Sequence, residues 1–292
     1  MKKTLIAFAA LAVAGAASAQ VTMSGALNFE YGRTNAAGAK ASNDQTESSA
    51  SNLAWTAVED LGGGMKATAY AQHRFNGNDG GSAATGARLF QNTTVALSGG
   101  FGTITAGRFL STSQSGYDAF GGWGAGYGYV GKIGARSDNS IGYASPSLGG
   151  AALKLVTTID PGANAREYQL VQVSYSSGPL SVLAGTERNV VAIGAATTST
   201  ETGLGLSYNA GAVTLLVNYG KGTDGTSNTS VGVRAPMGAM TVKAQYTSGD
   251  AASVTGLGVD YALSKKAGFY ADVFTKGSGA QSAYRMGLNM GF

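Results

Sequence analysis

From Val21 onward, apolar and polar side chains alternate along the chain, and this period of two predicts β-strands. The segment VTMSGALNFEY (21–31) places its large apolar side chains on one face and Thr, Ser, Asn and Glu on the other. The segments MKATAYAQHRF (65–75), MTVKAQYT (240–247) and AYRMGLNMGF (283–292) repeat this pattern. Because a strand sends successive side chains to opposite faces, each segment reads as a strand with one apolar and one polar face. None shows the 3.6-residue apolar period of a helix over more than two turns.

Sixteen such segments follow one another along the chain. They start near residues 21, 50, 65, 88, 101, 139, 151, 168, 179, 202, 212, 229, 239, 254, 267 and 282. The sequence therefore predicts an all-β fold of sixteen strands.

The connections between these segments alternate between short and long. Seven are tight and turn-like, and all but the last contain Gly, Pro or Asn, which favour turns: 59–64, 98–102, 146–150, 176–179, 209–211, 236–238 and 263–266. Eight are longer and polar: 34–49, 76–87, 111–138, 160–167, 189–201, 221–228, 248–253 and 277–281. All short turns then lie at one end of the sheet, together with both termini, and all long loops lie at the other. Bacterial outer-membrane barrels show this asymmetry, with short periplasmic turns and long external loops.

The first nineteen residues differ from the rest and read as a secretory signal peptide. Lys2 and Lys3 form a basic start, residues 5–14 form a short apolar stretch, and residues 17–19 read Ala-Ser-Ala, a small-residue cleavage site. We expect cleavage after Ala19, which leaves a mature chain from Gln20 to Phe292. The alternative is an anchor that stays attached, although the apolar stretch is too short to span a membrane as a helix.

Composition narrows the function classes. The absence of Cys excludes disulfides, thiolate metal sites and a Cys nucleophile, and the single His excludes a multi-His metal centre. After the leader, no run approaches the 18 apolar residues that indicate a membrane helix. The hydrophobic share of 43% argues against disorder. The formal net charge of +4 falls to +2 without Lys2 and Lys3, which gives no sign of nucleic-acid binding.

An alternating sheet of this kind has three possible interpretations. A soluble sandwich needs a strongly charged outer face, yet charged residues are only 12% of the chain. An enzymatic barrel would have to use His73, which alternation places on the apolar face beside Phe75, near the loop end of its strand. A wide, water-filled barrel pairs all backbone groups within the protein, turns its apolar face to lipid and its polar face to water. We favour this third interpretation: a 16-stranded antiparallel transmembrane β-barrel.

Several segments resemble the general diffusion porins of Gram-negative outer membranes, particularly the β-proteobacterial group. The most specific is SNLAWTAVEDLGGGMKA (51–67), followed by RLFQNTTVALSGGFGTITAGRF (88–109), which includes a Gly-Arg pair before the third long loop. The segments NSIGYASPSLGG (139–150) and VDYALSKKAGFYA (259–271) and the strand that ends in Phe are also similar. The resemblance implies a homotrimer of 16-stranded barrels in the outer membrane, without a cofactor, and a third loop that folds inward and narrows each pore. It also makes Phe292 a C-terminal assembly signal.

The third long connection, residues 111–138, is the longest, with 28 residues and eight Gly. Loops of this length in compact domains are usually functional. Its five aromatic residues suit a loop anchored against a barrel wall: Tyr117, Phe120, Trp123, Tyr127 and Tyr129. Residues 126–131 fit G-x-G-x-x-G, but no helix follows, so we do not interpret them as a nucleotide site.

Alternation assigns seven basic and four acidic side chains to the lumen. The basic ones are Lys66, Arg74, Lys154, Arg234, Lys243, Lys276 and Arg285, and the acidic ones are Glu30, Glu187, Asp260 and Asp272. The lumen is therefore expected to be mildly electropositive. Arg108 is difficult to place, because strict alternation groups it with Ile104 and Ala106. Either the register shifts at Gly107 or the apolar pair faces inward.

The resemblance implies a constriction between basic wall residues and acids of the third loop. It places the Arg108 position on the pore wall, and we expect Arg74, Arg108 and Lys66 to form the basic side. Asp118 is the expected loop carboxylate, with Lys132 and Arg136 further along the loop. The alternative is that each of these side chains is a solvated lumen charge without a role in selectivity.

The chain also departs from the family at three positions. Asn52 stands where the family commonly has Arg, Thr56 where it often has Lys, and Phe109 where Gln often follows the Gly-Arg pair.

The sequence thus predicts a channel for passive diffusion of small hydrophilic solutes and ions, with a mild anion preference. A substrate-specific channel is one alternative, because Tyr and Trp of the third loop could stack on sugars or aromatic solutes. A structural or adhesive surface barrel is another.

Overall fold

A computed structural model describes most of the chain as one β-sheet. The described residues are 20–36, 42–44, 51–77, 79–81, 89–110, 136–159, 166–191, 198–222, 225, 227–250, 253–276 and 281–292. The strands are β1 (Gln20–Ala36), β2 (Ser42–Asp44), β3 (Ser51–Gly62), β4 (Met65–Phe75), β5 (Asn92–Gly99), β6 (Gly102–Leu110), β7 (Arg136–Ala144), β8 (Ala151–Thr158), β9 (Arg166–Ser177), β10 (Leu180–Val191), β11 (Thr198–Asn209), β12 (Thr214–Lys221), β13 (Ser227–Met237), β14 (Met240–Gly249), β15 (Val254–Ala262), β16 (Ala267–Lys276) and β17 (Gln281–Gly291). Within these residues, no helix is long and apolar enough to span a membrane.

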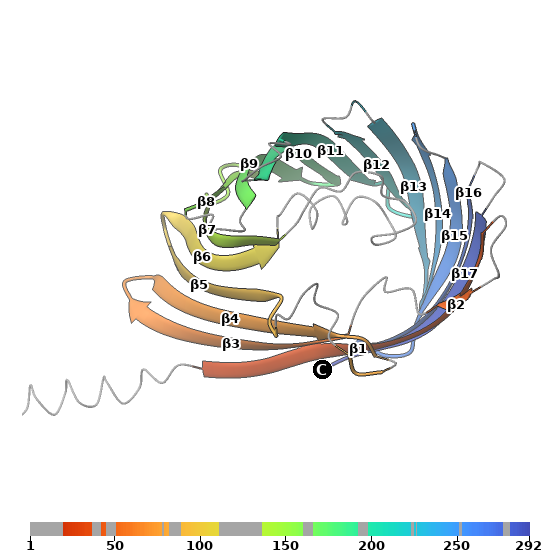
Figure 1. The fold of residues 1–292 in the computed structure, drawn as a ribbon, viewed down its shortest axis with the longest axis horizontal. Coiled ribbons are helices and arrows are strands. Elements are labelled where there is room, and N and C mark those ends of the chain that lie inside the picture. The colour runs from red at the N-terminus through yellow and green to blue at the C-terminus, as the bar shows by residue number, and fades with distance from the viewer. Residues whose placement is uncertain are drawn as a thin grey trace, which may run out of the picture.

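The sheet closes on itself into a barrel (Figure 1). Each strand from β3 to β17 pairs antiparallel with its neighbour in the chain, and β1 pairs with β17 on one side and β3 on the other. The ladder between β1 and β17 runs from Ala26 opposite Gly291 to Ala36 opposite Gln281. A closed barrel leaves no strand edge unpaired, which is the condition for crossing hydrocarbon with strands. The predicted 16-stranded antiparallel barrel is confirmed.

One strand was not predicted. The three residues of β2 lie within the connection 34–49, which we expected to be a loop, and they pair with Gly32, Arg33 and Thr34 of β1. The reason lies in the length of β1, because β3 covers only its first part, from Gln20 to Ala26. The backbone beyond that point offers unpaired groups to which a short segment can bind. Three residues carry no periodicity that could reveal such a strand.

The outer and inner faces follow the predicted alternation. On β1, Val21, Met23 and Phe29 are each at least 60% exposed, as expected for side chains that face lipid. Glu30 next to them is only 6% exposed and lies on the inner face. The inner face is not polar throughout, because Val156, Tyr168 and Leu170 form a buried apolar cluster on β8 and β9.

The predicted turns and termini gather at one end of the barrel. Short turns join β3 to β4, β5 to β6 and each later pair that the sequence assigned to this end. The C-terminal residue lies here as well, since the backbone of Phe292 exchanges two hydrogen bonds with Gly25 of β1, at 3.0 and 3.2 Å. A Cβ at Gly25 would lie 2.6 Å from the Phe292 ring, so the absence of a side chain at Gly25 leaves the space that this ring occupies.

Candidate functional site

The inner face of β4 carries two of the predicted constriction residues. Arg74 and Lys66 lie on the same face of this strand, and neither makes an ion pair within the described part of the chain. Arg74 lies directly opposite Asn52 of β3 in the ladder. Next to this pair, Gln72 donates to Asn52 Oδ1 at 3.4 Å and accepts from Asn92 Nδ2 at 2.8 Å. Amide side chains from β3 to β5 thus surround Arg74 on this part of the wall.

Arg108 lies at an irregularity between β6 and β7. Ile104 is 40% exposed, so the apolar pair of β6 stays on the outer face. The register shifts between Gly107 and Phe109, which is the first of the two possibilities that the sequence left open. Gly107 has φ = +130°, and a Cβ there would lie 2.2 Å from the carbonyl oxygen of Thr93, so no other residue fits.

The Arg108 side chain is held by two partners. Its Nη1 pairs with the carboxylate of Asp138 on β7, and its Nε donates to the carbonyl oxygen of Gln91 at 3.1 Å. The side chain is 18% exposed. Because Asp138 neutralises the guanidinium, Arg108 contributes less net charge than the unpaired Arg74.

The structure corrects the predicted position of one further constriction residue, Arg136, and the remaining ones lie outside the described residues. Arg136 was expected in the third long loop but is the first residue of β7, where its backbone lies opposite Leu110. The strand therefore starts three residues before the predicted position near 139, because the ladder with β6 continues past the irregularity. The predicted residues outside the described ranges are Asp118, Lys132, Tyr117, Phe120, Trp123, Tyr127 and Tyr129.

A network of paired charges occupies the inner wall from β14 to β17. Lys243 Nζ lies 2.7 Å from Asp260 Oδ1 and 3.3 Å from Asp272 Oδ1. Arg285 binds the second oxygen of Asp272 through Nη2 at 2.9 Å and Nε at 3.0 Å. Lys243, Asp272 and Arg285 are each at most 7% exposed. One carboxylate thus joins an ammonium and a guanidinium on two other strands.

The network continues across the junction between β17 and β1. Arg285 Nη1 lies 3.6 Å from Glu30 Oε2, and the Tyr270 hydroxyl donates to the same oxygen at 2.5 Å. The Arg285 guanidinium also lies 5.7 Å from the centre of the Tyr270 ring, a cation–π distance. We call Glu30, Lys243, Asp260, Tyr270, Asp272 and Arg285 the seam network.

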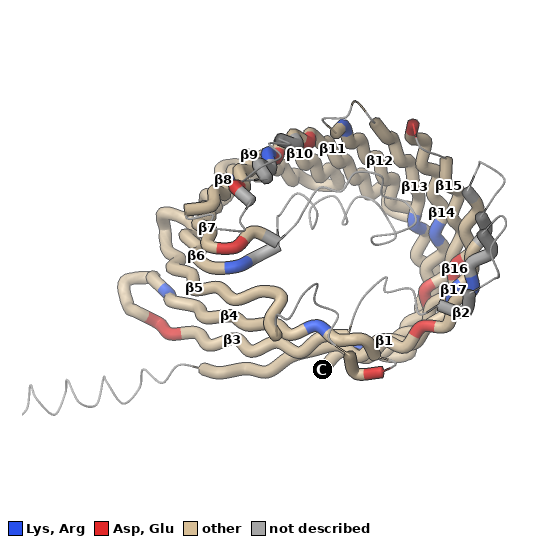
Figure 2. The backbone as a smooth tube through the Cα atoms, in the orientation of Figure 1, with Lys and Arg blue, Asp and Glu red and all other residues tan. Residues whose placement is uncertain are grey.

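The seam network changes the charge balance expected from the sequence. Of the seven basic and four acidic lumen residues, it contains two basic residues and three carboxylates, which gives it a net charge of about −1. Figure 2 shows acidic and basic positions side by side along these strands. Lys66 and Arg74 on β4 and Lys154 on β8 are left without an ion pair among the described residues. Among the described residues, Arg74 on β4 and Lys154 on β8 are therefore the wall cations with neither an ion pair nor a carboxylate directly opposite, whereas Lys66 lies opposite Asp60.

His73 takes no part in a catalytic arrangement within the described residues. Its ring stacks on Phe75 with 5.9 Å between ring centres, and its Nδ1 is bonded to the carbonyl oxygen of Leu89. Among the described residues, no group of three His, Cys, Asp or Glu side chains could hold a metal ion.

Sequence reasoning missed two features of this wall. Asp138 lay within a segment that we assigned to the third loop, and only the β6–β7 ladder reveals it as the partner of Arg108. The pairing of Asp272 with Lys243 and Arg285 also depends on the register between strands, because these residues are far apart in the chain. Alternation gave the face of each residue but not its partner.

Comparisons with known proteins agree with this architecture. The family described as "Gram-negative porin" matches residues 5–278. "Outer membrane porin protein 32" of Delftia acidovorans is 34% identical over 340 aligned positions, which cover 100% of this chain and 96% of that protein. The solved structure of the "anion-selective porin from Comamonas acidovorans" is 25% identical with a TM-score of 0.75, covering 94% of this chain and 100% of that one. The trimer form of OmpT from Vibrio cholerae is similar in fold, with 15% identity, a TM-score of 0.71 and coverage of 94% and 100%.

Proposed function

The chain belongs to the Gram-negative porin family, and from this premise we propose that its channel favours anions over cations. The protein is an outer-membrane porin, through which small hydrophilic solutes and ions pass by passive diffusion. Its relatives are channels without catalytic activity, and we propose the same for this chain. The only His, His73, is stacked on Phe75 and bonded to a backbone carbonyl, and within the described residues it is not paired with a carboxylate or a nucleophile.

The charge distribution of the inner wall carries the proposal of anion preference. Lys66, Arg74 and Lys154 have no ionic partner within the described residues, while three of the four predicted lumen carboxylates belong to the seam network. Fixed positive charge raises the local concentration of anions in a narrow aqueous channel and lowers that of cations. The similar porin from Comamonas acidovorans is described as anion-selective, which supports the same sign of selectivity.

Arg74 is the residue that we propose as the main charge of the constriction. The family commonly carries Arg at the position of Asn52, and Arg74 lies directly opposite Asn52 on the neighbouring strand. Residues that are directly opposite in an antiparallel pair lie about 5 Å apart. The charge that is absent from β3 is thus supplied at nearly the same place from β4. Arg108 is proposed as a secondary contributor, facing Asp118 of the third loop. Lys66 was expected on the same side, but it lies eight residues from Arg74, about 26 Å along β4, beside the turn and opposite Asp60, which is too far to share the constriction.

We further propose that residues 111–135 fold into the lumen and that three barrels assemble into a trimer. The buried apolar cluster of Val156, Tyr168 and Leu170 on the inner wall supports the first point, because an open aqueous lumen would leave it exposed. A trimer form is described for the OmpT relative, and chemical cross-linking of the purified protein tests the second point.

Two processing signals also remain proposals. β1 begins at Gln20, directly after the proposed cleavage site at Ala19. Phe292 is proposed as the assembly signal, and its backbone bonds to Gly25 place it at the closure of the barrel. N-terminal sequencing of the mature protein tests the cleavage, which would yield Gln20 as the first residue.

Single-channel recording in a potassium chloride gradient tests the proposed function. We expect stepwise conductance with a reversal potential that favours chloride. A reversal potential of the opposite sign would disprove the anion preference. Solute flux that saturates with concentration would indicate a substrate-specific channel, whereas linear flux would indicate a general pore. No conductance would indicate a structural or adhesive barrel.

A further inference from the structure

The amide side chains beside Arg74 form a chain of hydrogen bonds that runs in one direction. Asn92 Nδ2 on β5 donates to Gln72 Oε1 on β4 at 2.8 Å, and Gln72 Nε2 donates to Asn52 Oδ1 on β3 at 3.4 Å. Asn92 is directly opposite Gln72 in the ladder, and Gln72 is diagonal to Asn52, so each bond joins neighbouring strands. We call Asn52, Gln72 and Asn92 the amide chain.

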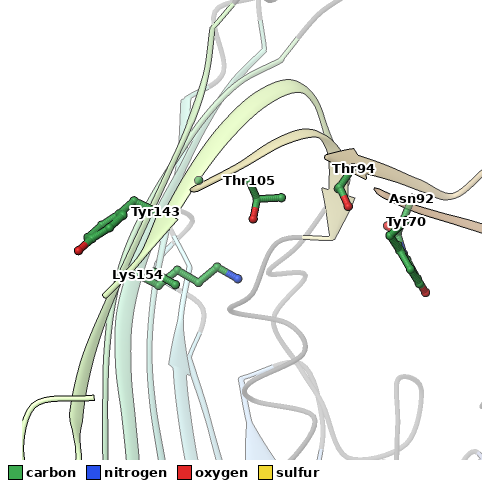
Figure 3. A pocket seen from close by; sticks show the side chains of 8 residues that line it. Tyr70, Asn92, Thr94, Thr105, Tyr143 and Lys154 are labelled. Carbon is green, nitrogen blue, oxygen red and sulfur yellow. The ribbon is translucent and has the colours of Figure 1, made fainter. Parts of the chain in front are cut away.

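The amide chain lies on the face of the wall that lines the lumen. Figure 3 shows Asn92 beside Tyr70, on the side of the wall to which Lys154 points, whereas Tyr143 points away to the other side. Tyr70 precedes Gln72 by two residues on β4, so both side chains share one face of that strand. Hydrogen atoms that the amide chain does not use are therefore presented to solutes in the lumen.

Asn52 ends the amide chain with an unused donor group. Its Oδ1 is turned toward Gln72, so its Nδ2 lies on the other side of the amide carbon, and this NH2 group has no hydrogen-bond partner within the described residues. The side chain is partly exposed. An amide NH2 group can donate two hydrogen bonds, and an amide whose oxygen already accepts a bond is a stronger donor. Gln72 thus orients and polarises the donor group of Asn52.

Arg74 lies directly beside this donor group. It is the residue opposite Asn52 in the ladder between β3 and β4, and side chains in such pairs have Cβ atoms about 5 Å apart. The other neighbour of Asn52 is Ala26 on β1, which carries no charge, and Arg74 makes no ion pair among the described residues. A charged donor and a neutral donor therefore stand next to each other on the wall without a carboxylate of the protein between them.

We propose that Arg74 and Asn52 together bind the carboxylate group of small organic acids as these solutes pass the wall. Arg74 supplies the charge and donates to one carboxylate oxygen, and Asn52 Nδ2 donates to the other. Gln72 and Asn92 are positioning residues, because they act through Asn52. Chloride is a single acceptor atom, so it can lie beside the guanidinium but cannot bridge two separate donors. The proposal rests on the proposed anion preference and adds a chemical class of solute to it.

Potentials between potassium acetate on one side of a planar bilayer and potassium chloride on the other test the proposal with the purified full-length protein. We expect an acetate-to-chloride permeability ratio above the ratio of the two mobilities in water. Asn52→Leu removes the neutral donor at constant charge and should lower the permeability ratio about fivefold, as expected for one lost hydrogen bond. Gln72→Met keeps the donor but no longer orients it, and should lower the ratio about twofold.

Asn289→Leu is the matched control. Asn289 lies on the same face of β17 as Arg285, near the short-turn end, so its loss removes a lumen amide far from Arg74 and should leave the permeability ratio unchanged. An unchanged ratio in Asn52→Leu, or an equal fall in Asn52→Leu and Asn289→Leu, would overturn the subsite. If Asn52→Leu does not assemble, Gln72→Met decides the question by the same comparison.

The reversal potential in a potassium chloride gradient separates this subsite from the proposed function. It should be the same in the wild type and in Asn52→Leu, because the substitution changes no charge. A wild-type channel without anion preference would disprove the proposed function, whereas an acetate ratio that does not depend on Asn52 would disprove the subsite alone. A chloride preference that falls together with the acetate ratio in Asn52→Leu would also overturn it, since the substitution would then act on all anions alike.

Discussion

Tyr270 on β16 donates its hydroxyl to Glu30 on β1 at 2.5 Å, although a complete strand lies between them. The residue on that intervening strand is Gly287, which is directly opposite Tyr270 on one side and Glu30 on the other. A Cβ at Gly287 would lie 2.4 Å from the Tyr270 ring. Glycine thus lets the ring lie flat over β17 and reach the first strand of the barrel.

Gly287→Ala should therefore destabilise the closed barrel. The new methyl group must displace the Tyr270 ring, which combines overpacking with the loss of a hydrogen bond to a carboxylate, and we expect a cost of about 2 kcal/mol. Urea unfolding in detergent micelles measures this free energy. Gly100→Ala is the matched control, because nothing lies within 4 Å of a Cβ there. Equal stability of the two variants would contradict this account of Gly287.

Asp272→Asn should destabilise the barrel more than Asp260→Asn. Asp272 is buried between Lys243 and Arg285, and its loss leaves two buried cations poorly compensated, at a cost of about 3–5 kcal/mol. The Asp260 side chain is 48% exposed, and removing its pair should cost at most about 1 kcal/mol. Urea unfolding compares the free energies of the two variants. A larger loss of stability in Asp260→Asn would show that Asp260 contributes more than Asp272 to the stability of the seam network.

The fold could be predicted from the sequence because its main signal is local. A lipid-facing side chain is apolar and the next one along the strand, which faces the lumen, is usually polar. The sequence of each strand therefore shows by itself which side chains face lipid. Exposed Val21 and buried Glu30 lie where alternation placed them. The three-residue β2 was not predicted, because it forms only where β1 extends beyond its ladder with β3.

Arg74→Glu should shift selectivity toward cations, and Arg108→Glu should shift it in the same direction. Each substitution changes the charge by two units, which amounts to roughly 1 kcal/mol for an ion about 8 Å away in water before screening. For Arg74→Glu we expect the anion-to-cation permeability ratio to fall about threefold in 0.1 M salt. Arg108→Glu makes the same change of two units and also leaves Asp138 without its partner. Reversal potentials in a salt gradient measure both variants.

Asp138→Asn supplies the converse comparison. It releases the charge of Arg108 and should raise the anion preference, provided that the Nε bond to Gln91 keeps the guanidinium in place. If the reversal potential is unchanged both in this variant and in Arg108→Glu, Arg108 does not contribute to the selectivity of the constriction.

The constriction could be predicted only in part, because the strength of a charge depends on its partner. Alternation placed Arg74, Lys243 and Arg285 equally on the wall. Register then joins Lys243 and Arg285 to carboxylates of neighbouring strands and leaves Arg74 opposite an amide. Register arises from turns and ladders between distant segments, and residue spacing within one strand does not contain it.

Replacing residues 111–135 by a short turn should increase the conductance of the open channel. The proposed inward loop occupies part of the lumen, and its removal would expose the apolar cluster of Val156, Tyr168 and Leu170 to water. Single-channel conductance in 1 M potassium chloride measures the change. Shortening the connection 222–226 between β12 and β13 is the control and should leave the conductance as it is.

The anion preference should weaken as salt concentration rises, and this dependence distinguishes a field from a binding site. The Debye length falls from about 10 Å at 0.1 M to about 3 Å at 1 M, so the field of Arg74 should no longer reach an ion at the pore centre. We therefore expect the chloride preference, measured as the reversal potential in potassium chloride gradients, to shrink between 0.1 and 1 M salt. A preference that is independent of salt would instead point to short-range contacts along the whole wall.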